Sequence, residues 1–440
     1  MIIRASFENI YSFNEETSIS FVAGKSDNLE ELVVRAQKRD EISLLKSGII
    51  YGANASGKSN VIKAIHLLKE IACGKWPANL IEPFKLKEPD NEPSRIEIEF
   101  KSGAKYFAYG IRFNIQGVVE EWLYEVKARS QKKVFERAVK SGENSISLGE
   151  KKLNTETAKF IEFLAKATPS KKSFLSEYNS RNGEGIDSIK NAYGWFNETL
   201  RIIFPESRFQ GLSFKIEEDK NFEKSFNSLL KYFNTGIDRI KRIPINKEEL
   251  KLPSDIVAEI QSELKPDSKN IVFSGNGEDL YFFEMAVDGT IKISMQKTVH
   301  KGSDNKEYTF NMHEESDGSI RLFDLIPMLI MLKLGNYVFL VDEIDRSLHP
   351  RLSYQIFDFF LQRLARDNEC QLIATTHECN LLDTKIFRRD EIWFVEKEKN
   401  GASHATSLVE FDFKEDIKKG YLQGRYGAIP FFTSPVNLKL

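Results

Sequence analysis

The chain has 440 residues and a mass of 50.6 kDa, a length that predicts two or three folding units or one domain with a large insertion. Hydrophobic residues make up 41% of it and charged residues 29%, which excludes the disordered and membrane-spanning classes. The 63 Lys and Arg and 65 acidic residues give a net charge of -2, so any attraction to nucleic acid or anionic lipid must come from a local patch.

Cysteine content and the lack of long apolar segments indicate where the protein works. Three cysteines, none of them in a CxxC pair, predict a reducing compartment and no disulfide framework. The first residues lack the apolar run of a signal peptide, and the most apolar stretch, residues 325–341, is interrupted by proline, lysine, glycine and asparagine. We therefore expect a cytoplasmic protein that has no membrane contact.

The N-terminal part, residues 1–130, is predicted to form one lobe. Alternation of apolar and polar residues predicts two short strands within residues 1–22 and an antiparallel meander from Ser94 to Glu125. Between them, Gly48–Tyr51 has the pattern of a buried strand, and apolar spacing over Asn60–Ala72 predicts a helix. The lobe thus contains a strand, a loop and a helix in direct succession.

The middle of the chain, residues 131–269, is predicted to be a mainly helical insertion. Helical spacing extends over Thr155–Thr168, Ile186–Ile203 and Phe222–Arg242. Prolines separate these segments and no heptad pattern persists, so a long coiled coil is not expected.

A basic segment overlaps the start of this insertion. Residues 126–172 contain 12 Lys and Arg against 5 acids, a local net charge of +7. Most charge runs of this kind are solvated faces, and contact with nucleic acid or with an acidic partner is the alternative.

The C-terminal part, residues 270–440, is predicted to be a second lobe of strands and helices. Its expected strands are Asn270–Phe273, Leu280–Val287, Thr290–Met295, Tyr337–Val341, Gln371–Thr375 and Glu391–Glu396, and its expected helices are Ser319–Leu334 and Pro350–Arg366. Strands and helices that alternate in this way predict an α/β fold.

A phosphate-loop motif lies between the first buried strand and its helix. Residues 52–59, GANASGKS, match the pattern GxxxxGK[ST] at every required position. In such a loop the backbone amides point at phosphate oxygens, Lys58 would reach the β and γ phosphates, and the Ser59 hydroxyl would bind Mg²⁺. A glycine-rich turn without a ligand is the alternative, and the flanking strand and helix favour the nucleotide site.

An apolar strand that ends in two acids, residues 339–343, fits the Walker B element. At the carboxyl end of a buried strand, Asp342 could hold Mg²⁺ through water, and Glu343 could polarise the attacking water. An acidic strand end is often only a solvated turn, but its combination with the phosphate loop favours the catalytic interpretation.

The spacing of these two elements, and a third motif, point to a family. Ser59 and Asp342 lie 283 residues apart, so a large insertion must separate two halves of one ATPase. This layout resembles the ATP-binding-cassette heads of the SMC and Rad50 class. Residues 315–321, ESDGSIR, are similar to the signature loop of those ATPases, although Asp317 replaces its first glycine. The resemblance implies that Ser316 and Gly318 bind the γ-phosphate held by a second subunit, and a simple helix cap is the alternative.

The same resemblance gives roles to further residues. His377 takes the place of the switch histidine that contacts the γ-phosphate, and residues 345–350 take that of the D-loop along the dimer seam. Tyr11 and Phe13 lie near where related heads contact the base or ribose, with core packing as the alternative. No Q-loop glutamine can be identified.

The implied site therefore has three sets of residues. The catalytic residues are Lys58, Glu343 and His377; the nucleotide-binding residues are Gly52, Asn54, Ala55, Ser56, Gly57, Lys58, Ser59 and Asn60 with Ser316 and Gly318; and the metal ligands are Ser59 and Asp342.

Further motifs narrow the resemblance to the AAA15/AAA21 group of prokaryotic ABC-type ATPases. They are the DEID and LHP residues from Asp342 to Pro350, the ATTH switch, and the tail Tyr421–Pro430. This group supplies ATPases of anti-phage systems, including PARIS, abortive-infection, RloA-like and Septu-like modules. The similarity covers residues 1–130 and 270–440, and the apolar tail is expected to dock onto the head or a partner.

The resemblance implies an ABC-type P-loop ATPase head with N- and C-terminal lobes, an antiparallel β subdomain and a helical insertion. It further implies an ATPase that uses ATP and Mg²⁺, forms a homodimer around ATP, and regulates a separate effector, such as a TOPRIM-type nuclease, in response to a phage-derived trigger. A RecF- or Rad50-like DNA repair ATPase that binds duplex DNA directly is the alternative. Direct DNA binding and assembly into a higher oligomer stay open.

Overall fold

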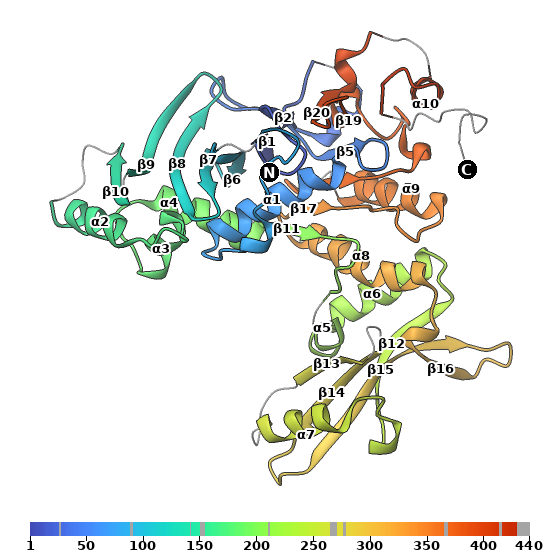
Figure 1. The fold of residues 1–440 in the computed structure, drawn as a ribbon. Coiled ribbons are helices and arrows are strands. Elements are labelled where there is room, and N and C mark those ends of the chain that lie inside the picture. The colour runs from blue at the N-terminus through green and yellow to red at the C-terminus, as the bar shows by residue number, and fades with distance from the viewer. Residues whose placement is uncertain are drawn as a thin grey trace, which may run out of the picture. The chain divides into compact units, whose positions relative to one another are not determined.

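The computed structural model describes residues 1–25, 28–88, 91–140, 142–149, 155–209, 212–264, 271–275, 279–364, 368–412 and 416–428. The chain forms two compact units: unit 1 contains Met1–Pro205, Leu332–Asp345 and Ile356–Leu440, and unit 2 contains Glu206–Met331 and Arg346–Gln355 (Figure 1). Within the described part of the chain, no helix is long and apolar enough to cross a membrane.

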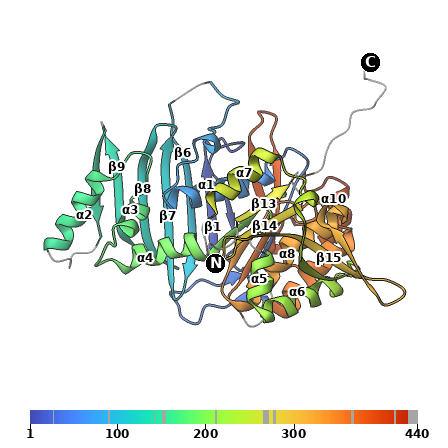
Figure 2. The same cartoon turned by 90° about the horizontal axis from the view of Figure 1, so that it is seen from below.

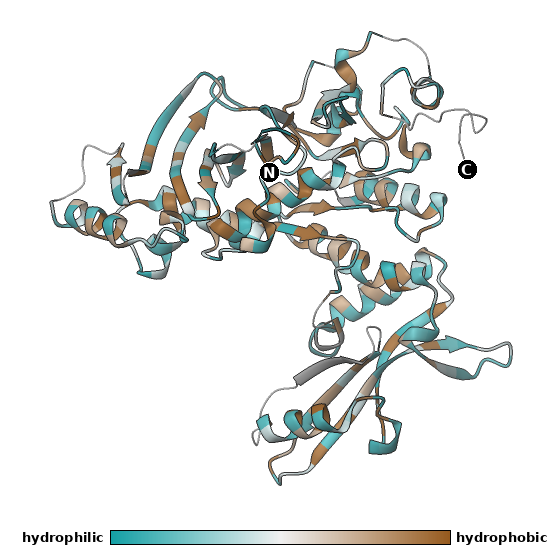
Figure 3. Cartoon of the chain, in the orientation of Figure 1, coloured by the Kyte–Doolittle hydropathy of each residue, from teal (hydrophilic) through white to brown (hydrophobic). Residues whose placement is uncertain are grey.

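Unit 1 contains a seven-stranded antiparallel sheet. Its strands are, in spatial order, β10 (Glu143–Leu148), β9 (Ser130–Lys140), β8 (Gly117–Lys127), β7 (Lys105–Asn114), β6 (Ser94–Ser102), β1 (Ile2–Glu8) and β2 (Thr17–Ser20). Buried and partly exposed residues alternate along β6, as expected for a sheet with one face on the core, and Figure 3 shows hydrophobic and hydrophilic residues alternating along these strands. The predicted strands within residues 1–22 and the predicted meander are confirmed.

Unit 1 also contains a six-stranded sheet. Its strands are, in spatial order, β11 (Leu200–Ile203), β17 (Val338–Val341), β18 (Gln371–Thr375), β5 (Ser47–Tyr51), β19 (Ile392–Lys397) and β20 (Ser403–Ser407). All neighbours are parallel except β19 and β20. The residues of β5, β17 and β18 are buried throughout, which is typical of parallel strands covered on both faces.

The position of β5 confirms the predicted two-lobe α/β fold. This N-terminal strand pairs with β18 on one side and with β19 on the other, so both ends of the chain build one sheet. Gln371 adds a second link, because its side chain accepts from the Ile2 amide at 2.7 Å and donates to the carbonyls of Ile2 and Leu45 at 3.1 and 2.9 Å.

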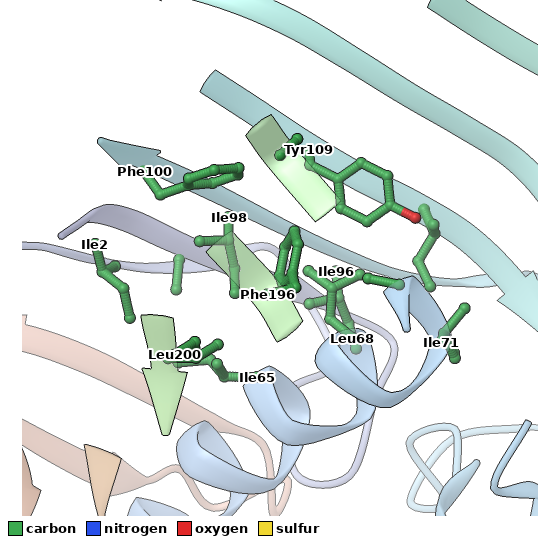
Figure 4. Packing of buried hydrophobic residues seen from close by; sticks show 14 of the residues in the cluster. Ile2, Ile65, Leu68, Ile71, Ile96, Ile98, Phe100, Tyr109, Phe196 and Leu200 are labelled. Carbon is green, nitrogen blue, oxygen red and sulfur yellow. The ribbon is translucent and has the colours of Figure 1, made fainter. Parts of the chain in front are cut away.

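Helix α1 (Lys58–Ala72) carries the main core of unit 1. Its side chains Ile65, Leu68 and Ile71 belong to one buried cluster with residues of β6 and of β11, which Figure 4 shows from close by. The same cluster includes Ile50, Leu340 and Ile373 from three strands of the six-stranded sheet. Helices α2 (Thr155–Ala167), α3 (Phe174–Ser180) and α4 (Asp187–Gly194) lie along the seven-stranded sheet (Figure 2).

A buried ion pair joins β8 and β9 to the start of α3. Arg137 Nη1 lies 3.2 Å from Glu121 Oε2, and both side chains are fully buried. The Glu121 carboxylate also accepts from the amides of Phe174 at 2.6 Å and Leu175 at 2.9 Å. Burial, followed by the charge of Glu121, raises the pKa of Tyr109 well above its usual value.

Unit 2 contains a five-stranded antiparallel sheet. Strands β12 (Ile237–Pro244), β15 (Ile291–Lys301), β14 (Asp279–Met285) and β13 (Ile271–Gly275) follow one another, and β16 (Glu307–Asn311) pairs with β15. Its helices are α5 (Leu212–Glu218), α6 (Lys220–Tyr232), α7 (Ser254–Glu263) and the first part of α8 (Asp317–Leu334). Ile260 of α7 packs on Tyr281, Phe283 and Met295 of the sheet.

The prediction of a mainly helical region over 131–269 is wrong in three places. The meander continues through β9 and β10, the end of the predicted helix Ile186–Ile203 is β11, and the end of Phe222–Arg242 is β12. Leu200–Ile203 is a strand because it pairs with β17, a partner far along the chain. The units also divide the chain differently from the predicted ranges, since residues 131–205 belong to unit 1 and residues 206–331 to unit 2.

The predicted C-terminal elements are largely confirmed. Strands β13, β14, β17, β18 and β19 and helix α8 match their predicted ranges closely. Strand β15 continues to Lys301, beyond the predicted end at Met295, and β16 and β20 were not predicted. Helix α9 spans Pro350–Phe359 and continues as a π-helical turn to Leu364. Asn270 and the last two residues of the predicted helix Pro350–Arg366 lie outside the described residues.

The C-terminal segment docks on unit 1, as its aromatic content predicts. Around helix α10 (Ile417–Leu422), Tyr426 and Tyr421 stack on Phe394 of β19 with ring centroids 5.0 and 5.9 Å apart. Gly427 has a φ of 76°, and a Cβ there would collide with the Glu396 carboxylate, so this close approach requires glycine. The last two residues of the predicted tail motif, Ile429 and Pro430, lie outside the described residues.

Candidate nucleotide-binding site

The phosphate loop connects β5 to α1, and two of its residues have the positive φ values that favour glycine. Ala55 and Gly57 have φ values of 63° and 109°. A Cβ at Gly57 would lie 2.5 Å from Ser403 Oγ and 2.6 Å from Ser12 Oγ, so both its conformation and its surroundings require glycine. Asn54 and Ala55 are exposed, whereas Ser56 is buried.

Two serines that sequence reasoning missed brace this loop. Ser403 of β20 donates from Oγ to the Ser56 carbonyl at 2.6 Å and from its amide to the Ser12 carbonyl at 2.7 Å. Asn60, predicted to contact nucleotide, donates from Nδ2 to Ser12 Oγ at 2.8 Å. The segment after β1 and strand β20 therefore hold the loop and the start of α1 together, although nothing in the local sequence of Ser403 signals this role.

Lys58 provides a buried positive charge inside the loop. Its ammonium donates to the carbonyls of Gly52 at 2.8 Å and Ala53 at 2.9 Å. Burial lowers the pKa of Lys58 to about 8, while the carboxylates of Asp342, Glu343 and Asp345 act in the opposite direction. The residue is 5% exposed, so its charge acts with little solvent screening.

The two predicted metal ligands meet at the carboxyl ends of their strands. Ser59 Oγ donates to Asp342 Oδ1 at 3.0 Å, although 283 residues separate them along the chain. Thr375, at the end of the neighbouring strand β18, donates from Oγ1 to the same carboxylate oxygen at 2.6 Å. A hydroxyl and a carboxylate are oxygen donors of the kind that Mg²⁺ prefers, so this pair fits the predicted metal.

The backbone of Glu343 is held in a strained conformation. Its φ is 47°, in the left-handed region that costs a non-glycine residue about 1–3 kcal/mol. Its amide donates to Thr375 Oγ1 at 2.8 Å. Thr375 therefore orients both acids of the Walker B pair, a role that sequence reasoning missed although the threonine belongs to the switch motif.

The predicted switch histidine follows β18 and is tied to the start of the D-loop. Asp345 accepts from Thr376 Oγ1 at 2.7 Å and from the His377 amide at 3.3 Å. Loss of hydration lowers the pKa of His377, and the charge of Lys58 lowers it further, against the opposing effect of the Asp345, Glu343 and Asp342 carboxylates. The imidazole is therefore neutral near neutral pH.

The predicted base contacts Tyr11 and Phe13 have packing roles instead. Phe13 is completely buried and stacks on Phe7 with ring centroids 5.2 Å apart. The Tyr11 hydroxyl donates to the Leu80 carbonyl at 2.7 Å. The structure thus supports the core-packing alternative for this pair.

The predicted signature residues belong to unit 2, at the start of α8. Ser316 Oγ accepts from the Ser319 amide at 3.2 Å, so this serine caps the helix. A Cβ at Gly318 would lie 2.9 Å from the carbonyl oxygen of Ser347 in the D-loop, and glycine permits this approach. The cap and the signature interpretation are compatible, because a capped helix start presents backbone amides to an anion.

Many solved structures are similar to the chain, among them three SMC heads. An SMC head bound to the C-terminal winged-helix domain of ScpA is 14% identical, with 92% of this chain and 97% of that chain covered and a TM-score of 0.42. The SMC head from Thermotoga maritima is 12% identical over 92% and 98%, with a TM-score of 0.38. An SMC head with an extended coiled coil, bound to the C-terminal domain of ScpA derived from Pyrococcus furiosus, is 13% identical over 97% and 98%, with a TM-score of 0.39.

Comparison with protein families gives a match across most of the chain. The model AAA_21, described as "AAA domain, putative AbiEii toxin, Type IV TA system", matches residues 49–383. No curated protein matches the chain. The matched range begins in β5 and includes the phosphate loop, the signature residues, the Walker B pair and His377, in agreement with the predicted resemblance. The chain therefore belongs to the AAA_21 family of AAA-domain proteins.

Proposed function

We propose that the chain binds ATP at the phosphate loop of unit 1 and hydrolyses it to ADP and phosphate. The observation that carries this proposal is the 3.0 Å contact between Ser59 Oγ and Asp342 Oδ1, which unites the two halves of the site. Glu343 follows Asp342 directly, so a carboxylate base stands beside the metal-ligand pair.

Each residue has a distinct task in this reaction. Lys58 supplies a positive charge to the β and γ phosphates. Ser59 and Asp342 would hold Mg²⁺, which when bound would supply further positive charge to the phosphate oxygens. Glu343 accepts a proton from the water whose oxygen bonds to the γ phosphorus, while the bond from that phosphorus to ADP breaks. Neutral His377 donates a hydrogen bond to the γ-phosphate.

We further propose that two copies close around two nucleotides. The start of α8, with Ser316 and Gly318, would meet the γ-phosphate held by the other copy. The hydroxyl and the amides of a capped helix start suit an anionic partner. Binding of ATP would close this homodimer, and hydrolysis would open it.

The biological role that we propose is regulation of a separate effector, a TOPRIM-type or other nuclease, in anti-phage defence. The description of the AAA_21 family, which names the AbiEii toxin and a type IV toxin–antitoxin system, supports the link to defence, whereas the separate effector is what the resemblance to defence ATPases implies. Co-purification of the chain from its native cell tests the proposal, because an associated nuclease is expected and its absence in infected and uninfected cells would contradict the role.

ATP affinity should fall as the pH rises through about 8. The pKa of Lys58 is lowered to about 8, so above this value the free protein loses the charge that faces the phosphates. The affinity for Mg-ATP should then fall about tenfold per pH unit, which titration calorimetry can measure. Lys58→Arg keeps its charge across this range, so its affinity should not change there, whatever its absolute value. Wild-type affinity that stays constant above pH 8 would contradict the role of Lys58.

Direct nucleic-acid binding is a second candidate function, supported by a basic cavity in unit 1. The cavity has a volume of about 540 Å³, and its charged lining residues are Lys38, Arg39, Lys105, Lys127 and Lys132 with Asp40, Glu41 and Glu125. Of the described basic residues in the predicted segment 126–172, only Lys127 and Lys132 line this cavity, and Arg137 is buried against Glu121 instead. The net positive lining would suit a phosphate backbone.

A paired charge reversal tests this candidate. Lys38→Glu with Arg39→Glu should weaken duplex DNA binding at least about tenfold at low salt. The slope of the logarithm of affinity against the logarithm of salt concentration should become less steep by the equivalent of about two phosphate contacts. Fluorescence anisotropy with labelled duplex measures both quantities. Lys63→Glu with Lys159→Glu, two exposed lysines outside the cavity, is the control and should bind like the wild type. Equal binding by all three proteins would exclude the cavity as the site.

A further inference from the structure

The residue before the signature serine is a buried acid. Glu315 lies between the short turn Met312–Glu314 and helix α8, and its side chain is only 8% exposed. Glutamate is almost never buried to this degree unless its charge is paired or hydrogen-bonded. We therefore expect partners for this carboxylate other than the groups that cap α8.

Two side chains of β15 hold this carboxylate. The Thr298 hydroxyl donates to Glu315 Oε1, and His300 Nε2 lies 2.7 Å from the same oxygen. Thr298 and His300 are two residues apart on one strand, so their side chains lie on the same face of the sheet. Thr298 is fully buried, and the His300 ring packs edge-on against Phe310 of β16 at a centroid distance of 4.8 Å.

The other side of the signature is fixed by helix α8. The Ser319 amide donates to Ser316 Oγ at 3.2 Å, and the Ile320 amide donates to the Ser316 carbonyl at 3.0 Å. Ser316 therefore lies between two fixed parts of the chain. Glu315, directly before it, is held on the sheet, and helix α8, directly after it, is held by hydrogen bonds at its own start. A shift of the Glu315 carboxylate must move Ser316 or break one of these bonds.

We infer that Glu315 is a positioning residue for ATP hydrolysis: its carboxylate, held by Thr298 and His300, places Ser316 and Gly318 where the nucleotide of a second copy meets them. The inference rests on the proposed function, because it assumes a dimer whose sites these residues complete. It also couples the β15–β16 hairpin to hydrolysis, since His300 contacts both Phe310 and Glu315.

Variants at both ends of the contact test this inference. Glu315→Ala and His300→Ala should lower kcat about 10- to 100-fold, because small misplacements of reacting groups have effects of this size. The affinity of the chain for ATP, measured by calorimetry at concentrations where it is monomeric, should stay within about twofold, since Lys58 and Ser59 belong to unit 1. His300→Gln keeps a side-chain N–H donor and should recover part of the lost kcat.

A second His–carboxylate pair in unit 2 supplies a matched control. Asp279 is also 8% exposed, and its Oδ2 lies 2.8 Å from His313 Nδ1. If the loss of any buried acid were enough to lower kcat, Asp279→Ala should lower it as much as Glu315→Ala. We expect the two variants to lose similar thermal stability, and only Glu315→Ala to have a lower kcat. Equal kcat values for Glu315→Ala and the wild type would overturn the inference, whereas a wild type without ATP turnover would overturn the proposed function instead.

Discussion

Glu343→Gln should lower ATP turnover by about 10²- to 10⁴-fold, the usual contribution of a general base, while ATP binding stays intact. The amide cannot accept a proton from the attacking water. It has nearly the same size and shape as the carboxylate. The strained backbone of Glu343 is held by the hydrogen bond from its amide to Thr375 Oγ1, which does not depend on the side-chain charge. Lys58, Ser59 and Asp342 remain available to hold Mg-ATP.

Two measurements separate this role from a structural one. Steady-state phosphate release gives the fall in kcat, and light scattering with ATP gives the mass of the complex, which should shift to the dimer because bound ATP persists. Glu92→Gln changes an exposed carboxylate, 73% accessible, and should match the wild type in both measurements. Normal turnover by Glu343→Gln would show that another group activates the water.

The features of the candidate site that the sequence predicts, and that the structure brings together, depend on local sequence. The eight residues from Gly52 to Ser59 carry their own turn and helix start, and the acids of the Walker B pair end an apolar strand. The meeting of Ser59 with Asp342 was also expected, because both motifs place their side chains at the carboxyl ends of parallel strands.

The parts that were missed depend on contacts distant in sequence. Thr375 acts through bonds to Asp342 and Glu343, and Ser403 acts through bonds to Ser56 and Ser12. The local sequence around these two residues does not indicate these contacts. Hydrogen-bonding roles of single hydroxyl groups are therefore visible only once the tertiary structure is known.

The wrong secondary structure in the middle of the chain has the same cause. Leu200–Ile203 continues a helical apolar pattern, yet it forms β11 because β17 offers a parallel partner for all four residues. Ile237–Pro244 likewise pairs with β15 as β12. Short strands owe their state to the partner strand more than to intrinsic propensity, so periodicity alone extends the helices too far.

Arg137→Met should destabilise unit 1 by about 3–5 kcal/mol, because it leaves a fully buried carboxylate without its cation. Glu121 would keep its bonds from the Phe174 and Leu175 amides, but the guanidinium that neutralises it would be gone. Arg137 also donates to the Lys172 carbonyl at 2.9 Å, and this acceptor would lose its partner. The contacts between β9 and the start of α3 should therefore weaken together.

Urea denaturation followed by tryptophan fluorescence measures this loss in unit 1 alone, because all 4 tryptophans of the chain lie in unit 1. Lys127→Met breaks the Lys127–Asp40 pair, in which both side chains are 61% exposed, and serves as the control. Surface pairs contribute about 0–1 kcal/mol, so this variant should unfold close to the wild-type midpoint.

The double variant Arg137→Met with Glu121→Met distinguishes loss of charge balance from loss of packing. If the uncompensated charge causes the damage, the double variant should be less destabilised than the sum of the two single variants, since neither charge remains buried alone. It should still be less stable than the wild type, because the Phe174 and Leu175 amides lose their acceptor. Additive single effects would mean that the ion pair itself contributes nothing, and that this corner of the sheet is held by the backbone amides that donate to Glu121 and by the backbone carbonyl that accepts from Arg137.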